Sequence, residues 1–187
     1  MDIFNNKRIG FGPRLGAAIL DRIIGGIFAS GIGIVMAILG LGAGSALGVA
    51  IDYQAELESS LEAIGLGAGL GALIGMLGGL IIGYFLYSLI EAFTGASLAK
   101  MILGYKAANE DGTSGDTTLY LKRWAIKNAS DVLSMITLMT GLIILQPIGS
   151  IIGFILFLGC FLVLGNEKQA LHDRIAKTAI YKKDDII

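Results

Sequence analysis

The sequence is poor in the residues that build disulfides, metal clusters and acid–base catalytic sites. Its 187 residues include one cysteine, Cys160, and one histidine, His172. A single cysteine excludes an intramolecular disulfide. A single histidine leaves no set of histidines that could hold a metal or activate a nucleophile. We therefore expect no enzyme and no cofactor, with Cys160 as a small buried side chain in its apolar run and His172 at the surface.

Charged residues are also scarce, at 16%, whereas 55% of the residues are apolar and 28 are glycine. The mean hydropathy is +0.76. Such a chain is too hydrophobic for a soluble domain and too long for a single-span anchor. These values indicate a small multi-pass membrane protein whose partner is the lipid bilayer rather than nucleic acid.

Three long apolar blocks are separated by polar segments. The first has no charge from Ile23 to Ile51, the second is interrupted only by Glu91, and the third is broken at Gln146-Pro147. Because about 20 residues cross the hydrocarbon core, we predict an all-α protein with four membrane segments, two long glycine-rich spans and a short hairpin turning at Gln146-Pro147. The predicted segments span approximately residues 15–51, 63–93, 131–146 and 148–165.

The positive charges determine the predicted topology. All 14 lysine and arginine residues lie within residues 7–22, 100–127 and 168–183, and the acidic loop 52–62 has none. The positive-inside rule then places both termini in the cytoplasm and residues 52–62 outside the cell membrane.

The polar segments are predicted to form amphipathic helices on the cytoplasmic side. Within residues 94–130, Ile102–Ala108 are predicted to form a short extended piece, and a helix follows the N-cap Asp116. In that helix, Trp124 and the basic Lys122, Arg123 and Lys127 suit lipid headgroups. The tail, residues 166–187, is predicted to form an amphipathic helix followed by a short β-like end. We expect residues 1–187 to form one domain.

Glycines recur every four residues on the two long spans. Residues four apart share one helical face, so each series forms a smooth surface that lets another backbone approach closely. Packing between the two spans is the preferred interpretation, and homo-oligomerisation is the alternative. The glycines are Gly40, Gly44 and Gly48 on the first span and Gly67, Gly71, Gly75, Gly79 and Gly83 on the second.

A few charged residues lie where the spans are expected to meet the cytoplasm, and charged residues in membrane helices usually have a functional or structural role. Arg14 and Asp21 stand on the first span, Glu91 ends the second, and Asp173 lies in the tail. The spacing allows Arg14 to meet Asp21 or a carboxylate from another segment.

Several of these motifs resemble those of the RDD family, named for one arginine and two aspartates. The segments RLGAAILD, with Arg14 and Asp21, and QALHDRIAKTAI, with Asp173, match that pattern. The segment Gly95–Lys100 is similar to the family's loop after the second span. Lys177 stands where the family pattern has glycine. The resemblance implies a membrane protein, and monovalent cation/proton transport is the activity most often attached to the family.

Two functions follow from these residues. In the first, Asp21 binds Na⁺, K⁺ or Li⁺ in exchange for H⁺, Asp173 or Glu91 is the second carboxylate, and Arg14 sets their pKa values. In the second, Arg14 pairs with Asp21 or Asp173 as an ion-pair staple in a structural or assembly protein. The uncharged centres of both long spans weaken the first hypothesis.

Overall fold

The computed structural model describes residues 6–51 and 57–187, so the first part of the predicted outer loop, residues 52–56, lies outside the described residues. The chain divides into two compact units. The two-helix unit contains Ile23–Tyr87. The mixed unit contains the chain up to Arg22 together with Ser88–Ile187.

Two long helices run through both units, α2 (Phe11–Ile51) and α3 (Leu57–Thr94). All shorter elements belong to the mixed unit. In chain order they are α4 (Leu98–Ile102), β1 (Tyr105–Asn109), α5 (Thr117–Lys127), α6 (Ala129–Thr140), α7 (Leu145–Cys160), the 3₁₀ helix η1 (Phe161–Leu164), α8 (Leu171–Ala176), β2 (Thr178–Lys182) and the 3₁₀ helix η2 (Lys183–Asp185).

Among the described residues, three helices are long and apolar enough to cross a membrane, namely Phe11–Gly48, Leu61–Thr94 and Leu145–Leu164. Helix α6 has 12 residues, which rise about 18 Å against a hydrocarbon core of about 30 Å. The chain is therefore a multi-pass membrane protein with three such helices, and the third predicted segment, residues 131–146, falls short of a full span.

The predicted hairpin turn is displaced along the sequence. Helix α6 ends at Thr140, Gly141 caps it in the left-handed conformation with φ 71°, and α7 begins at Leu145. The turn thus occupies residues 141–144, and the prediction of Gln146-Pro147 as the turn is wrong. Pro147 lies instead in the first turn of α7, where proline removes no intrahelical hydrogen bond.

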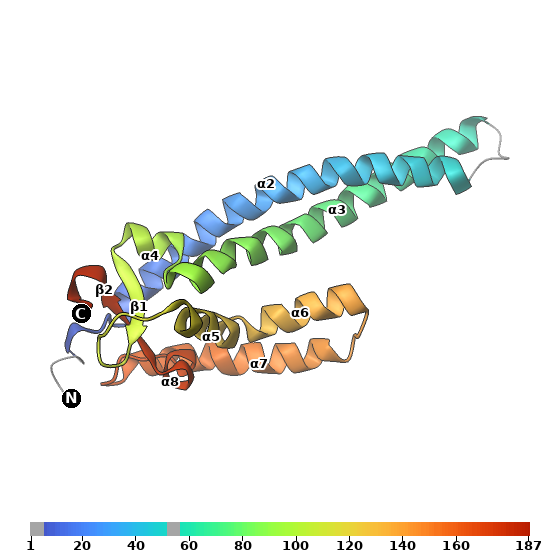
Figure 1. Ribbon diagram of the computed structural model, residues 1–187. Helices are drawn as coiled ribbons and strands as arrows, with labels where there is room; N and C mark the ends of the chain where they lie inside the picture. The colour runs from blue at the N-terminus through green and yellow to red at the C-terminus, as the bar shows by residue number, and fades with distance from the viewer. Residues whose placement is uncertain (1–5, 52–56) are drawn as a thin grey trace. The chain divides into compact units, whose positions relative to one another are not determined.

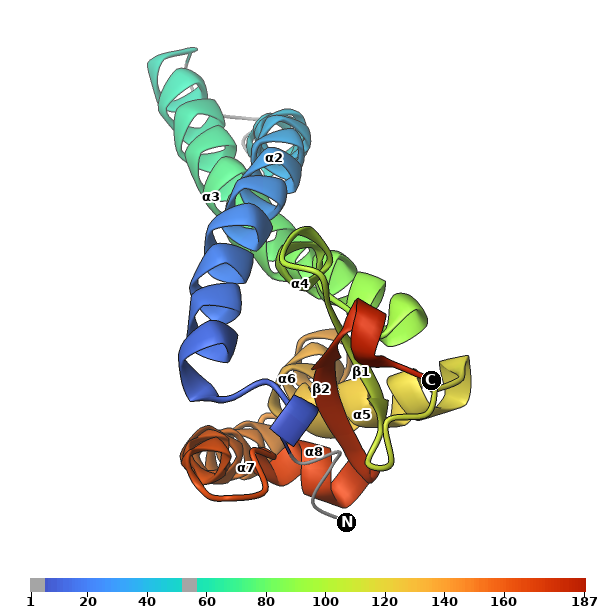
Figure 2. The ribbon, with the colours of Figure 1, turned by 90° about the vertical axis from the view of Figure 1, so that its left-hand side faces the viewer.

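The fold also contains a small sheet, which is formed by the two segments predicted to be extended, although the fold class was predicted as all-α. Strands β1 and β2 pair antiparallel with Ala107 opposite Ile180 (Figure 2). The segment before α2 extends the pairing, because Arg8 forms a bridge with Tyr181 and the Ile9 N–H donates to the Ile180 carbonyl at 2.8 Å. This short pairing joins three distant parts of the chain, which a hydropathy pattern cannot reveal.

The sheet packs on a compact apolar core within the mixed unit. Ile9, Ala107, Tyr120 and Ile180 form one buried cluster on one side of the sheet. Ala179 and Tyr181, which are also fully buried, belong to a second cluster. Strands this short are marginal without such packing, so the core holds the sheet in place.

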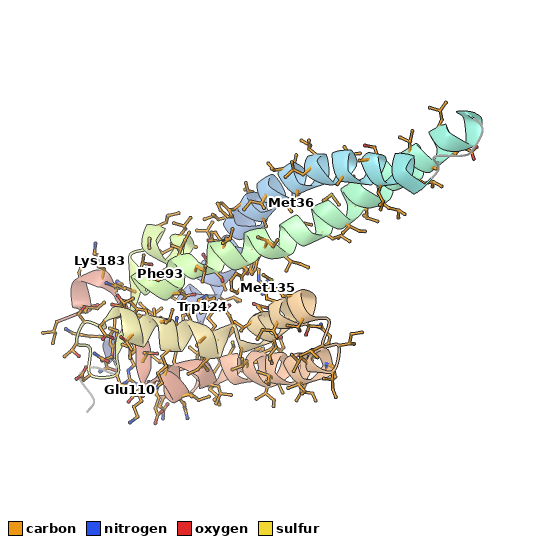
Figure 3. The ribbon with its side chains drawn as sticks, turned by 45° about the vertical axis from the view of Figure 1, so that its right-hand side comes forward. Met36, Phe93, Glu110, Trp124, Met135 and Lys183 are labelled. Carbon is orange, nitrogen blue, oxygen red and sulfur yellow. The ribbon has the colours of Figure 1, made fainter. Side chains whose placement is uncertain are left out.

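The exposed surfaces of the membrane-length helices are apolar. Ile27 and Leu66 are each 70% exposed in the two-helix unit, and Figure 3 shows carbon-rich side chains projecting along both helices. Cys160, predicted to be buried, is exposed at the end of α7. Apolar side chains facing outward are expected where the surrounding solvent is lipid.

In the two-helix unit, α2 and α3 lie side by side (Figure 1), with the glycines of the predicted four-residue series directed at the other helix of the same chain. A Cβ atom added to Gly44 would overlap the carbonyl oxygen of Gly67, and one added to Gly40 would overlap that of Gly71. A Cβ on Gly83 would lie 2.8 Å from the Ala29 Cα. The importance of these contacts for stability stays a prediction.

Substituting Gly44 by alanine should destabilise the helix pair by about 1–3 kcal/mol, because the added methyl group forces the backbones apart. The matched control is Gly42→Ala on the same helix, where a Cβ meets nothing within 4 Å. The control should be neutral or slightly stabilising, since alanine favours helix. Denaturant unfolding in detergent micelles measures both, and equal effects would contradict the packing role.

Candidate functional site

The candidate site lies in the mixed unit and centres on one face of α5. The Asp116 side chain caps this helix by accepting the Leu119 N–H at 2.8 Å. Tyr120, Arg123 and Trp124 share the buried face of the helix. The Trp124 indole donates to Ser88 Oγ at 3.1 Å. The prediction that Arg123 and Trp124 face lipid headgroups is therefore wrong.

Arg123 joins two buried carboxylates from different parts of the chain. Its Nε donates to Asp173 Oδ1 at 2.9 Å, and its Nη1 donates to Glu91 Oε1 at 2.6 Å. All three side chains are at most 4% exposed. Burial alone would lower the pKa of Arg123, but the two carboxylates raise it above its ordinary value. The guanidinium therefore stays charged and links α3 to α8.

Asp173 receives a second arginine, from the start of α2. Arg14 Nη1 donates to Asp173 Oδ2 at 2.5 Å, and the remaining Arg14 donors bind the Ile9 and Lys168 carbonyls at 2.9 and 2.8 Å. Burial alone would raise the pKa of Asp173, but the positive charge of Arg123 and Arg14 holds it well below its usual range. Arg14 and Asp173, predicted as partners, are brought together.

Glu91 is surrounded by three cations. In addition to Arg123, Lys100 Nζ donates to its Oε1 and Lys127 Nζ donates to its Oε2. Burial lowers the pKa of Lys100 to about 8, and the Glu91 carboxylate offsets only part of that effect. The Glu91 carboxylate is thus engaged on both oxygens by side chains of the protein itself.

These six side chains form what we call the ion-pair network: Arg14, Glu91, Lys100, Arg123, Lys127 and Asp173. Four are cationic and two are anionic, which leaves a charge of about +2. A cation site needs an excess of carboxylate oxygens, and the network has the opposite balance. Among residues 6–51 and 57–187, no group of three or more His, Cys, Asp or Glu side chains could hold a metal ion.

Asp21 has different surroundings from those that the Arg14–Asp21 hypothesis requires. Its carboxylate accepts hydrogen bonds from Ser97 Oγ and from the Ala99 N–H, the latter at 3.2 Å. Ser97 is the N-cap of α4. Asp21 therefore ties α2 to the segment after α3, while the carboxylate that Arg14 meets is that of Asp173.

His172 is buried, not at the surface as predicted. It is 7% exposed, and its Nε2 lies 3.4 Å from Arg123 Nη2 and 3.3 Å from Asp173 Oδ1. Burial lowers its pKa to about 3, although the Asp173 charge opposes that shift. The ring is therefore neutral at physiological pH, and the ring tautomer decides whether Nε2 accepts from Arg123 or donates to Asp173.

Sequence reasoning missed Arg123, Lys100 and Lys127 as members of the site. A signal for α5 was present, because Tyr120, Arg123, Trp124 and Lys127 follow the i, i+3, i+4, i+7 spacing of one helical face. The aromatic residues on that face indicated burial. Arg123 lies among these aromatic residues, and a buried arginine is expected to pair with a buried carboxylate.

A family model described as the RDD family matches residues 8–177, which is most of the chain and includes every member of the ion-pair network. The chain belongs to the RDD family. No curated protein and no solved structure matches it.

Two features of this RDD protein bear on the family pattern. Gly95 has φ 76° and lies against the Tyr120 ring, so the loop before α4 depends on glycine at that point. Lys177, which stands where glycine was expected, adopts φ 57° at the end of α8. The turn geometry is kept even though a side chain raises its conformational energy.

The buried neutral His172 should make the mixed unit unstable at acidic pH. Its pKa is lower in the folded state than in the unfolded chain, so the unfolded state binds more protons as the pH falls below about 6.5. The free energy of unfolding should then decrease by roughly 1 kcal/mol per pH unit between about pH 6 and 4.

The variant His172→Gln should remove this slope, measured by denaturant unfolding in detergent from pH 8 to 3. A steeper loss below about pH 4 should remain in both proteins, because Asp173 must then be protonated to unfold the unit. An unchanged slope between pH 6 and 4 in the variant would contradict the assignment.

Proposed function

We propose that this RDD protein is a structural or assembly protein of the cell membrane, in which the ion-pair network staples the polar segments onto the foot of the membrane helices. The observation that carries the proposal is Arg123, whose guanidinium binds Asp173 and Glu91 at once. With Arg14 and Lys100 added, five separate helices contribute charge to one buried network.

The energetics of buried charges support a holding role. Removing one partner of a buried ion pair leaves an uncompensated charge and costs about 3–5 kcal/mol. Each carboxylate of the network contacts at least two cations. If any one segment moved away, a buried side chain would therefore lose an oppositely charged partner. The ion-pair network therefore favours a single arrangement of the helices that contribute its charged side chains.

We propose the cytoplasmic side for the mixed unit. Its limits enclose all 14 lysine and arginine residues of the chain, and Ile23–Tyr87 has none. Positive residues are retained on the cytoplasmic side of a membrane. Both termini belong to that unit and are placed in the cytoplasm with it.

Monovalent cation/proton exchange is the alternative function that the family resemblance implies. It would have to use Asp21, because the oxygens of Glu91 and Asp173 bind cationic side chains. The uncharged stretches of α2 and α3 offer few groups to replace the hydration shell of an ion at membrane depth. These points favour the staple over transport.

A double-mutant cycle tests the staple. Arg14→Ala and Asp173→Ala should each destabilise the protein, and the double variant should lose less than the sum by about 1.5–3 kcal/mol. The matched control is the exposed pair Lys7–Asp185, with atoms 3.8 Å apart, whose coupling should stay below about 0.5 kcal/mol. Additive losses for Arg14 and Asp173 would contradict the staple.

Proteoliposomes separate the staple from transport. The staple predicts no proton movement driven by Na⁺, K⁺ or Li⁺ gradients beyond that of empty vesicles. A flux through the wild-type protein that Asp21→Asn abolishes, with the thermal stability preserved, would establish transport and overturn the staple as the primary function.

A further inference from the structure

A cavity of about 600 Å³ lies in the mixed unit, between the start of α2 and the end of η1. Both are ends of helices long enough to cross a membrane. The Phe11 and Phe161 rings stack with centroids 6.1 Å apart, so the two ends are packed together. The ends of spanning helices lie at the level of lipid headgroups.

One side of the cavity is apolar and continues onto the outer surface. Phe11, Val163 and Leu164 line it. Val163 is buried, but Leu164 is 65% exposed and the neighbouring Phe161 is 46% exposed. An acyl chain lying along this surface would enter the cavity without crossing a polar barrier.

The other side of the cavity is polar and positively charged. It is lined by Asn6, Asn166 and Lys168, which together offer amide donors and an ammonium group. The carboxylate of the adjacent Glu167 pairs with Arg174 at 3.3 Å. Amide and ammonium groups are suitable donors for phosphate and glycerol oxygens.

The backbone of Lys168 is held in an unusual conformation at this place. Its φ is 50°, a region that costs free energy for any residue with a Cβ. Two hydrogen bonds fix it, since its N–H donates to the Gly165 carbonyl at 3.1 Å and its carbonyl accepts Arg14 Nη2 at 2.8 Å. Strained residues of this kind cluster at binding sites.

We propose that this cavity binds the headgroup of an anionic glycerophospholipid, with the phosphate at Lys168 and the acyl chain over Phe11 and Leu164. The volume falls within the range of small-molecule sites, and basic pockets between membrane helices suit anionic lipids. The apolar half favours a lipid over free phosphate. None of the cavity-lining residues belongs to the ion-pair network, although Arg14 of that network binds the Lys168 carbonyl, so lipid binding and the staple are tested by separate measurements.

Lipid binding to the purified full chain in detergent, measured by native mass spectrometry and by the lipid-induced rise in melting temperature, tests the proposal. Phosphatidylglycerol should bind at least about fivefold more tightly than phosphatidylcholine. Lys168→Asn, which keeps a residue that tolerates positive φ, should weaken phosphatidylglycerol binding by about fivefold. Gly10→Leu should have a similar effect, because Gly10 lines the cavity and a Cβ there meets nothing within 4 Å.

Two matched controls separate the cavity from general effects. Lys177→Asn removes another lysine at positive φ, and Gly12→Leu adds the same side chain at another open glycine. Both should bind as the wild type does. Three results would overturn the proposal. They are equal affinity for the two lipids, an equal loss of phosphatidylglycerol affinity in Lys177→Asn and Lys168→Asn, and a rise in melting temperature with inorganic phosphate equal to that with phosphatidylglycerol. If Gly10→Leu does not fold, the phosphatidylglycerol affinity of Lys168→Asn tests the proposal by itself.

Discussion

The structure of the mixed unit depends on one constraint, the neutralisation of two buried carboxylates that lie 82 positions apart in the sequence, at residues 91 and 173. Neither can be buried unless cations reach it, and one guanidinium, that of Arg123, reaches both. The helices that carry these groups must therefore meet at a single place. The sheet of β1 and β2, adjacent to α8 in the chain, is positioned by the same requirement.

The two units are stabilised by different physical means. In the two-helix unit, we expect close backbone approach at glycines to take the place of the hydrophobic effect, which offers no gain between helices surrounded by lipid. In the mixed unit, we expect charges and hydrogen bonds to select one arrangement. This chain thus concentrates its lysine and arginine residues in the mixed unit, and Ile23–Tyr87 has none.

The sequence predicted the long helices well, because runs of apolar residues determine them directly. It also predicted that Arg14 has Asp173 available as a partner, since both were placed on one side of the membrane. It predicted extended segments at the two strand positions but not their pairing, and it missed the role of Arg123, because both depend on contacts between distant segments. The hairpin turn was misplaced because Pro147 was interpreted as a helix breaker, whereas proline is tolerated in the first turn of a helix.

The most direct test of the central claim is hydrogen exchange of the full chain in lipid nanodiscs, comparing Arg123→Met with the matched exposed variant Lys122→Met. If Arg123 holds the mixed unit together, its loss should accelerate exchange of the β1, β2 and α8 amides together by roughly 100-fold, equivalent to about 3 kcal/mol. Amides of Ile23–Gly48 should exchange as before, and Lys122→Met should change little. Faster exchange confined to α5, or none at all, would contradict the account.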